Sequence, residues 1–132
     1  MTDAHYGITK NIGKIDFDEA IDKVTAALKT QGFGVLTEID VKATLKKKLD
    51  VEFRQYRILG ACNPPLAHQA LTNELMIGLL LPCNVVVFEE EDGTTTVSAI
   101  DPSEMFKVVD RPEMASLAGQ VGDKLKLVLD AL

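Results

Sequence analysis

Tryptophan is absent from this 132-residue chain, and only two cysteines, Cys62 and Cys83, are present. Two cysteines are too few for a scaffold held together by disulfides, and a domain of this size does not need one. No segment approaches the roughly 20 apolar residues of a membrane span, and the N-terminal residues lack the basic start and apolar stretch of a secretory signal. We therefore expect a cytoplasmic protein with no membrane partner and with mostly reduced thiols.

Positive charge is also scarce. Fourteen Lys and Arg residues face 20 Asp and Glu residues, which gives a formal net charge of −6. This balance opposes binding to a phosphate backbone, so we expect no nucleic-acid partner. The hydrophobic fraction of 46% and the charged fraction of 26% are those of a soluble globular protein and exclude a disordered chain. The length predicts a single domain over residues 1–132.

Strand and helix patterns alternate along the chain. Five segments have the alternation or the composition of strands, namely residues 6–12, 33–39, 51–62, 83–90 and 94–100. Helical spacing or capping residues predict a helix that follows Asp16 and ends at Gly32, helices at residues 41–49, 64–76 and 114–132, and a short helix that begins at Pro102. The fold class that we predict is α+β, with a largely antiparallel sheet of about five strands covered by helices.

The third and fourth predicted strands are apolar on both faces. Leu59 and Ala61 alternate with Ile58, and Val86 and Phe88 alternate with their valine neighbours. An antiparallel sheet covered on one side would leave such a second face in water. We expect this face to be covered by the second copy of a homodimer or to form a ligand groove.

The two cysteines flank the predicted helix at residues 64–76. About 12 helical residues advance the chain by roughly 18 Å, and the extended segment that follows can return it by about 20 Å. If the two strands are antiparallel, Cys62 and Cys83 therefore lie close together. A right-handed parallel crossover is the alternative, and it would place them at opposite ends of the sheet.

Each cysteine precedes an asparagine, Asn63 or Asn84, whose amide can bind the turn backbone or a ligand. Cys62 also lies just before a predicted helix N-terminus, where the helix dipole stabilises a thiolate. Three interpretations of the cysteines remain open: inert core residues, a thiol pair with redox chemistry, and ligands of a metal ion.

Two further side chains complete the candidate site. His68 is the nearest imidazole, and with Cys62 and Cys83 it would hold zinc with one open position, whereas the thiolates alone would suit copper(I). The spacing matches no strong zinc signature, so a solvent-exposed His68 is the simpler interpretation. Arg57 on the third strand is a candidate clamp for an anion or a carboxylate, or an ordinary surface charge.

Four stretches resemble the domain-of-unknown-function family number 302: Gly32-Phe-Gly-Val-Leu-Thr-Glu-Ile-Asp40, Tyr56-Arg-Ile-Leu-Gly-Ala-Cys-Asn-Pro64, Leu80-Leu-Pro-Cys-Asn84 and Ala99-Ile-Asp-Pro102. The resemblance covers nearly the whole chain. It implies a homodimeric α+β domain of the TATA-box-binding-protein-like type, β-α-β(4)-α with inserted short helices. It supplies no established activity, and the fold name carries no claim of DNA binding.

The resemblance also implies that the two Cys-Asn pairs, with Pro64, form the characteristic cluster of the family. We expect a homodimeric binding module that holds a small ligand or a metal ion near Cys62 and Cys83. One alternative is a redox enzyme in which Cys62 attacks and Cys83 resolves. The other is a structural dimer with inert core cysteines. The sequence names neither a reaction nor a ligand.

Overall fold

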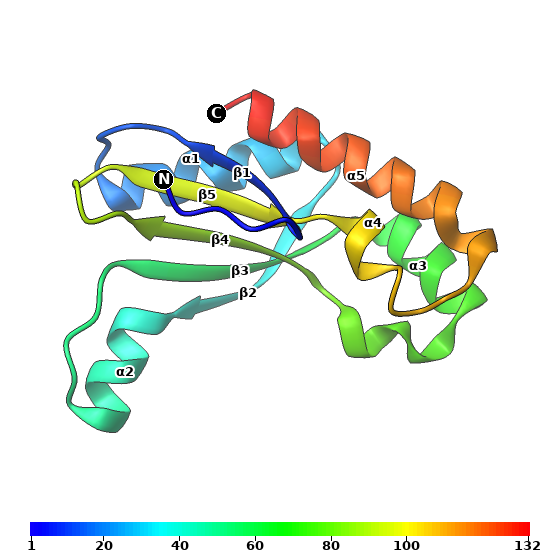
Figure 1. The fold of residues 1–132 in the computed structure, drawn as a ribbon, viewed down its shortest axis with the longest axis horizontal. Coiled ribbons are helices and arrows are strands. Elements are labelled where there is room, and N and C mark those ends of the chain that lie inside the picture. The colour runs from blue at the N-terminus through cyan, green and yellow to red at the C-terminus, as the bar shows by residue number, and fades with distance from the viewer.

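The computed structural model describes residues 1–132 and contains one open antiparallel sheet (Figure 1). Its strands follow one another across the sheet in the order β1-β5-β4-β3-β2, and every neighbouring pair is antiparallel. The strands are β1 (Gly7–Asn11), β2 (Gly34–Asp40), β3 (Tyr56–Cys62), β4 (Cys83–Glu89) and β5 (Thr95–Ile100). The predicted α+β class and its five-stranded antiparallel sheet are confirmed.

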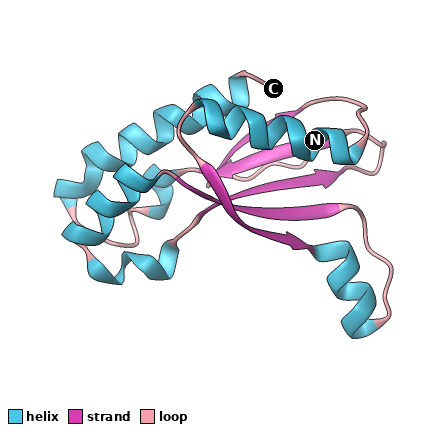
Figure 2. Ribbon diagram, turned by 180° about the vertical axis from the view of Figure 1, so that it is seen from behind, coloured by secondary structure: helices cyan, strands magenta, loops and turns pink.

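Helices lie on one face of the sheet and at one of its ends. The helical elements are α1 (Phe17–Thr30), α2 (Val41–Leu49), α3 (Pro64–Asn73), the 3-10 helix η1 (Leu75–Leu80), α4 (Pro102–Met105), the 3-10 helix η2 (Pro112–Met114) and α5 (Ala115–Asp130). Figure 2 shows α1 and α5 in front of the same face, whereas α2 projects away from the body of the protein. None of these helices has both the length and the apolar character needed to cross a membrane.

The hydrophobic core lies between the sheet and the pair α1 and α5. The sheet contributes fully buried side chains such as Leu59, Val85 and Val97, which alternate with residues of the opposite face. On α1, Val24 and Leu28 lie one turn apart and are also fully buried. Helix α1 begins at the predicted position because the side chain of its N-cap residue, Asp16, accepts a hydrogen bond from the backbone N–H of Glu19.

Two predicted boundaries are wrong. Strand β3 begins at Tyr56 rather than at residue 51, because β2 ends at Asp40, opposite Arg57, and leaves residues 51–55 without a partner on that side. The helix predicted at residues 64–76 ends at Asn73, and the return to the sheet is a 3-10 helix rather than an extended segment. The side chain of Ile77 in this turn is 1% exposed, so burial in the core accompanies the tighter winding.

Candidate functional site

Cys62 and Cys83 lie at the same end of the sheet. In the antiparallel pair β3-β4, Cys83 is opposite Ala61, and Cys62 is opposite Gly34 in the pair β2-β3. The antiparallel arrangement predicted from chain length is therefore present, and the parallel crossover is not. Both cysteines are free thiols.

The two thiols differ in their surroundings. Cys83 is buried, and burial raises the pKa of its thiol from 9.0 to about 11, with a smaller contribution from the nearby Cys62. Because directly opposed residues share a face of the sheet, Cys83 points with Ala61 toward the helices. Cys62 is one residue further along β3, so its side chain leaves the strand toward the other face, and it is only half-buried.

An apolar cavity of about 260 Å³, here called the Cys cavity, lies at this end of the sheet. Fourteen of its 16 lining residues are hydrophobic. Its walls come from the sheet end with both cysteines, from α3, from α5 and from the region of α4, through residues such as Ala61, Leu66, Ala67, Ala70, Leu81, Met105, Phe106, Leu117 and Val121. The cavity therefore joins elements that are far apart in the sequence.

Asn63 lines the Cys cavity, but its amide already has two partners within the chain. Its side-chain oxygen accepts a hydrogen bond from the backbone N–H of Leu66 at 3.4 Å and caps α3. Its side-chain nitrogen donates to the carbonyl oxygen of Gln31 at 3.1 Å, which ties α3 to the end of α1. Asn63 thus fixes one wall of the cavity, as the predicted cap at this position required.

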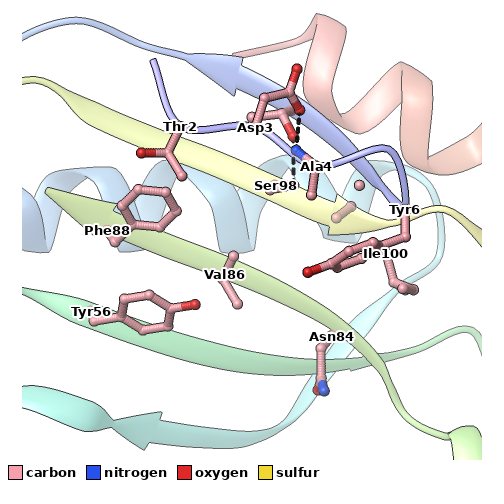
Figure 3. A pocket seen from close by; sticks show the side chains of 13 residues that line it. Thr2, Asp3, Ala4, Tyr6, Tyr56, Asn84, Val86, Phe88, Ser98 and Ile100 are labelled. Carbon is pink, nitrogen blue, oxygen red and sulfur yellow. Dashed lines mark hydrogen bonds between the residues drawn. The ribbon is translucent and has the colours of Figure 1, made fainter. Parts of the chain in front are cut away.

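The side chain of Asn84 lies on the other face of the sheet from the side chain of Cys83. Asn84 follows Cys83 on β4, so its side chain points to the opposite face of the sheet, where it is exposed. It lines a second cavity on that face, which also contains Tyr6, Tyr56 and Phe88 (Figure 3). The two Cys-Asn pairs therefore have different structural positions despite their similar sequence.

Arg57 lies toward the other end of β3. It is opposite Val87, four residues before Ala61, which corresponds to a separation of about 13 Å along the strand. Its guanidinium Nη1 is 2.7 Å from a carboxylate oxygen of Glu38, and its Nε is 3.4 Å from one of Asp40. The guanidinium also lies 5.8 Å from the centre of the Phe17 ring. Arg57 thus binds acidic residues of β2 and does not join the cysteines.

His68 is exposed on α3 and does not line the Cys cavity. Nowhere in the chain do three or more His, Cys, Asp or Glu side chains form a group able to hold a metal ion. The set Cys62, Cys83 and His68 that was considered for zinc is therefore not assembled. Sequence reasoning found the two thiols but missed the α5 and α4 walls of the cavity, for which the sequence has no local signal.

The fold and this site define a small α+β domain with an open antiparallel sheet and an apolar cavity beside two free thiols. Residues 8–132 match the family described as domain of unknown function DUF302, and the chain belongs to that family. A similar solved structure is that of an uncharacterized conserved DUF302 protein from Bacillus stearothermophilus. It is 30% identical, covers 97% of this chain and 98% of its own, and has a TM-score of 0.89. No curated protein matches the chain.

Proposed function

We propose that the protein is a binding module whose Cys cavity holds a small, uncharged and mainly apolar molecule. The observation that carries this proposal is the cavity itself, since about 260 Å³ of space lined almost entirely by apolar side chains lies at the sheet end. Binding sites for small molecules are mostly apolar hollows with few polar groups. Because 14 of the 16 lining residues are hydrophobic, the walls offer water few hydrogen-bond partners and favour apolar ligands.

The thiols fit a binding role better than a redox role. Thiol–disulfide exchange needs a thiolate, and a pKa of about 11 keeps Cys83 protonated at neutral pH. The side chains of Cys62 and Cys83 also leave their strands toward opposite faces, which disfavours a disulfide without movement of the backbone. In the binding role, the protonated sulfur of Cys83 supplies a soft, polarisable contact for the ligand.

Fluorescence titration with N-phenyl-1-naphthylamine, an uncharged apolar probe, tests the proposal. We expect saturable enhancement with the wild-type protein and at least a tenfold loss of affinity in Ala67→Phe, because Ala67 lines the cavity and the larger ring would fill it. Ala26→Phe on the exposed side of α1 is the matched control and should bind as the wild type does. No saturable enhancement, or equal binding by both variants, would refute the proposal.

The redox alternative makes a different prediction. If Cys62 attacks and Cys83 resolves, Cys83→Ser should trap a mixed disulfide on Cys62 with a small disulfide such as oxidised glutathione. Mass spectrometry that finds this adduct in the variant but not in the wild type would favour the redox enzyme. Two unreactive thiols together with no probe binding would favour the structural dimer.

Copper(I) is the metal alternative, because two thiolates alone suit a soft ion. Zinc would need further ligands, which the exposed His68 does not supply at the cavity. Titration with copper(I) and with zinc, followed by elemental analysis of the dialysed protein, distinguishes these ions from an apolar ligand.

We also propose that the module is a homodimer that associates through a surface called here the β2 edge patch, formed by Ile39, Leu49 and Val51. Strand β2 is at the edge of the sheet, so its outer backbone groups have no strand partner. Helix α2, which follows directly, has no buried residue, and the three apolar side chains of the patch are exposed. Most of the stability of a helix comes from packing, and a second copy packed on this surface would bury more of α2.

Sedimentation equilibrium tests this association. A wild-type dimer that dissociates in the double variant Ile39→Lys/Leu49→Lys would support the proposal. The control is Leu75→Lys, because Leu75 is 81% exposed on η1, away from the patch. A wild-type monomer at high concentration, or a dimer that only Leu75→Lys disrupts, would refute it.

A further inference from the structure

A second cavity, called here the open-face cavity, occupies the side of the sheet that the helices leave uncovered (Figure 3). Its volume is about 340 Å³, which is within the range of small-molecule sites. Tyr56, Val86 and Phe88 form its floor. The rings of Tyr56 and Phe88 are nearly parallel, with an interplanar angle of 11° and centroids 5.4 Å apart. Figure 3 shows the two rings side by side. Phe88 is buried and Tyr56 is half-buried, so the Tyr56 ring, supported by Phe88, is the accessible aromatic surface of the cavity.

The residues before β1 form one wall of this cavity, and they are held in place. The backbone N–H and the hydroxyl of Thr2 donate to the Glu90 carboxylate at 2.8 and 2.7 Å. The carbonyl oxygen of Tyr6 accepts a hydrogen bond from the backbone N–H of Asp101 at 2.8 Å. Figure 3 shows Thr2, Asp3 and Ala4 over the β5 side of the sheet.

Three polar groups at the cavity have no partner within the chain. The hydroxyls of Tyr6 and Tyr56 and the amide of Asn84 line the space, and none of them makes a hydrogen bond in the structure. Burial raises the pKa of the Tyr56 phenol, and the phenol of Tyr6 raises it further. These groups are free to bind the edge of a ligand.

Charge restricts the ligand further. No Lys or Arg side chain lines the cavity, whereas the exposed carboxylate of Asp3 does. A phosphate or a carboxylate placed here would meet like charge and no cation. A flat, uncharged ring could stack on Tyr56 and accept or donate hydrogen bonds at its edge, and the Asp3 carboxylate would not repel it.

We propose that the open-face cavity binds an uncharged, flat aromatic or heteroaromatic molecule. The ligand stacks on the Tyr56 ring, which Phe88 supports, and is hydrogen-bonded at its edge by Tyr6, Tyr56 and Asn84. This site is separate from the Cys cavity. Failure of apolar-ligand binding at the Cys cavity would not affect this proposal, and the reverse also holds.

Fluorescence anisotropy with lumichrome, an uncharged planar tricyclic molecule with carbonyl and N–H groups on its edge, tests this proposal. We expect saturable binding by the wild type and about tenfold weaker binding by Tyr56→Leu, because aromatic stacking of a base-like ring contributes on this scale. Tyr56→Phe, which keeps the ring, should lose less affinity than Tyr56→Leu. Flavin mononucleotide, which adds a charged phosphate to a similar ring system, should bind at least tenfold more weakly than lumichrome.

Two control variants make the outcome specific. Phe53→Leu removes an exposed aromatic ring next to Tyr56 that does not line the cavity, and it should bind lumichrome as the wild type does. Ala67→Phe, which fills the Cys cavity, should also leave lumichrome binding unchanged. Far-ultraviolet circular dichroism checks that each variant is folded.

The proposal is overturned by any of three results. These are no saturable binding of lumichrome by the wild type, equal affinity in Tyr56→Leu, and tighter binding of flavin mononucleotide than of lumichrome. A change of sedimentation in Tyr56→Leu with unchanged lumichrome binding would also overturn it, since the face would then be an interface between copies.

Discussion

Cys83 and Asn84 are consecutive residues of β4, yet their side chains belong to two different cavities on opposite faces of the sheet. Cys83 is buried toward the helices, and Asn84 is exposed on the open face. The alternation of side chains along a strand produces this separation. The Cys83-Asn84 pair thus contributes one side chain to each of two cavities. A substitution in one cavity can therefore be tested without changing the other.

The buried thiol of Cys83 should make stability depend on alkaline pH. Its pKa of about 11 in the folded protein exceeds the ordinary value of 9.0, so the unfolded chain loses this proton first. The contribution of the neutral thiol is therefore complete below pH 9 and is lost as pH rises toward 11, by about 2 to 3 kcal/mol in total.

Urea unfolding at pH 8, 9, 10 and 11 measures this effect. Cys83→Ala should show a flatter decline between pH 9 and 11 than the wild type. Burial also raises the pKa of the Tyr56 phenol, and this lowers stability at alkaline pH equally in both proteins. The difference between the two pH profiles therefore reports the Cys83 thiol alone. Parallel declines in the two proteins would contradict the assignment.

Gly60 should not tolerate a side chain. A Cβ atom at this position would collide with the Oγ1 of Thr37 and would lie 2.7 Å from the Cγ of Pro82. We expect Gly60→Ala to destabilise the fold by about 1 to 3 kcal/mol, as overpacking does. Gly34 on the neighbouring strand is the matched control, since a Cβ there meets no atom within 4 Å and its φ is not positive. Equal urea midpoints for the two variants would contradict this account.

Asn63 should contribute to stability through both ends of its amide. Asn63→Ala removes the cap of α3 and leaves the Gln31 carbonyl without its donor, so we expect a loss of about 2 to 3 kcal/mol. Asn63→Asp keeps the capping oxygen but sets a carboxylate oxygen against the Gln31 carbonyl, so it should also lose stability. As a comparison, Asp101→Ala removes the cap of the short helix α4 and should cost about 1 kcal/mol. Thermal unfolding of the three variants would contradict the dual role if Asn63→Ala cost no more than Asp101→Ala.

Arg57 should act on stability rather than on ligand binding. Arg57→Ala removes the ion pairs with Glu38 and Asp40 and the contact with the Phe17 ring, and we expect a loss of about 1 kcal/mol because the acidic partners are partly exposed. Arg54→Ala is the control, since Arg54 is exposed and donates a single hydrogen bond to the Glu89 carbonyl. Weaker binding of N-phenyl-1-naphthylamine in Arg57→Ala, with unchanged stability, would instead place Arg57 at the ligand site.

Much of the fold could be predicted from local patterns. The cap residues Asp16 and Asn63 marked helix starts, because capping depends on a side chain and the backbone two or three residues away. The boundaries that failed depended on distant partners: residues 51–55 are not a strand because β2 has already ended opposite Arg57. Ile77 is buried in the core although other residues of its 3-10 turn are exposed, and no local pattern predicted this.

For the candidate site too, the sequence predicted some features, and only the tertiary structure determined the others. Chain length and helix geometry were sufficient to bring Cys62 and Cys83 to one end of the sheet, because they limit how far a helix and its return segment can travel. The register between strands decided that Cys83 opposes Ala61, that Asn84 faces the open side and that Arg57 meets Glu38. The packing of α5 and α4 then enclosed the Cys cavity. Register and enclosure arise from contacts between residues that are remote in sequence, and such contacts leave no periodic signal in any single segment.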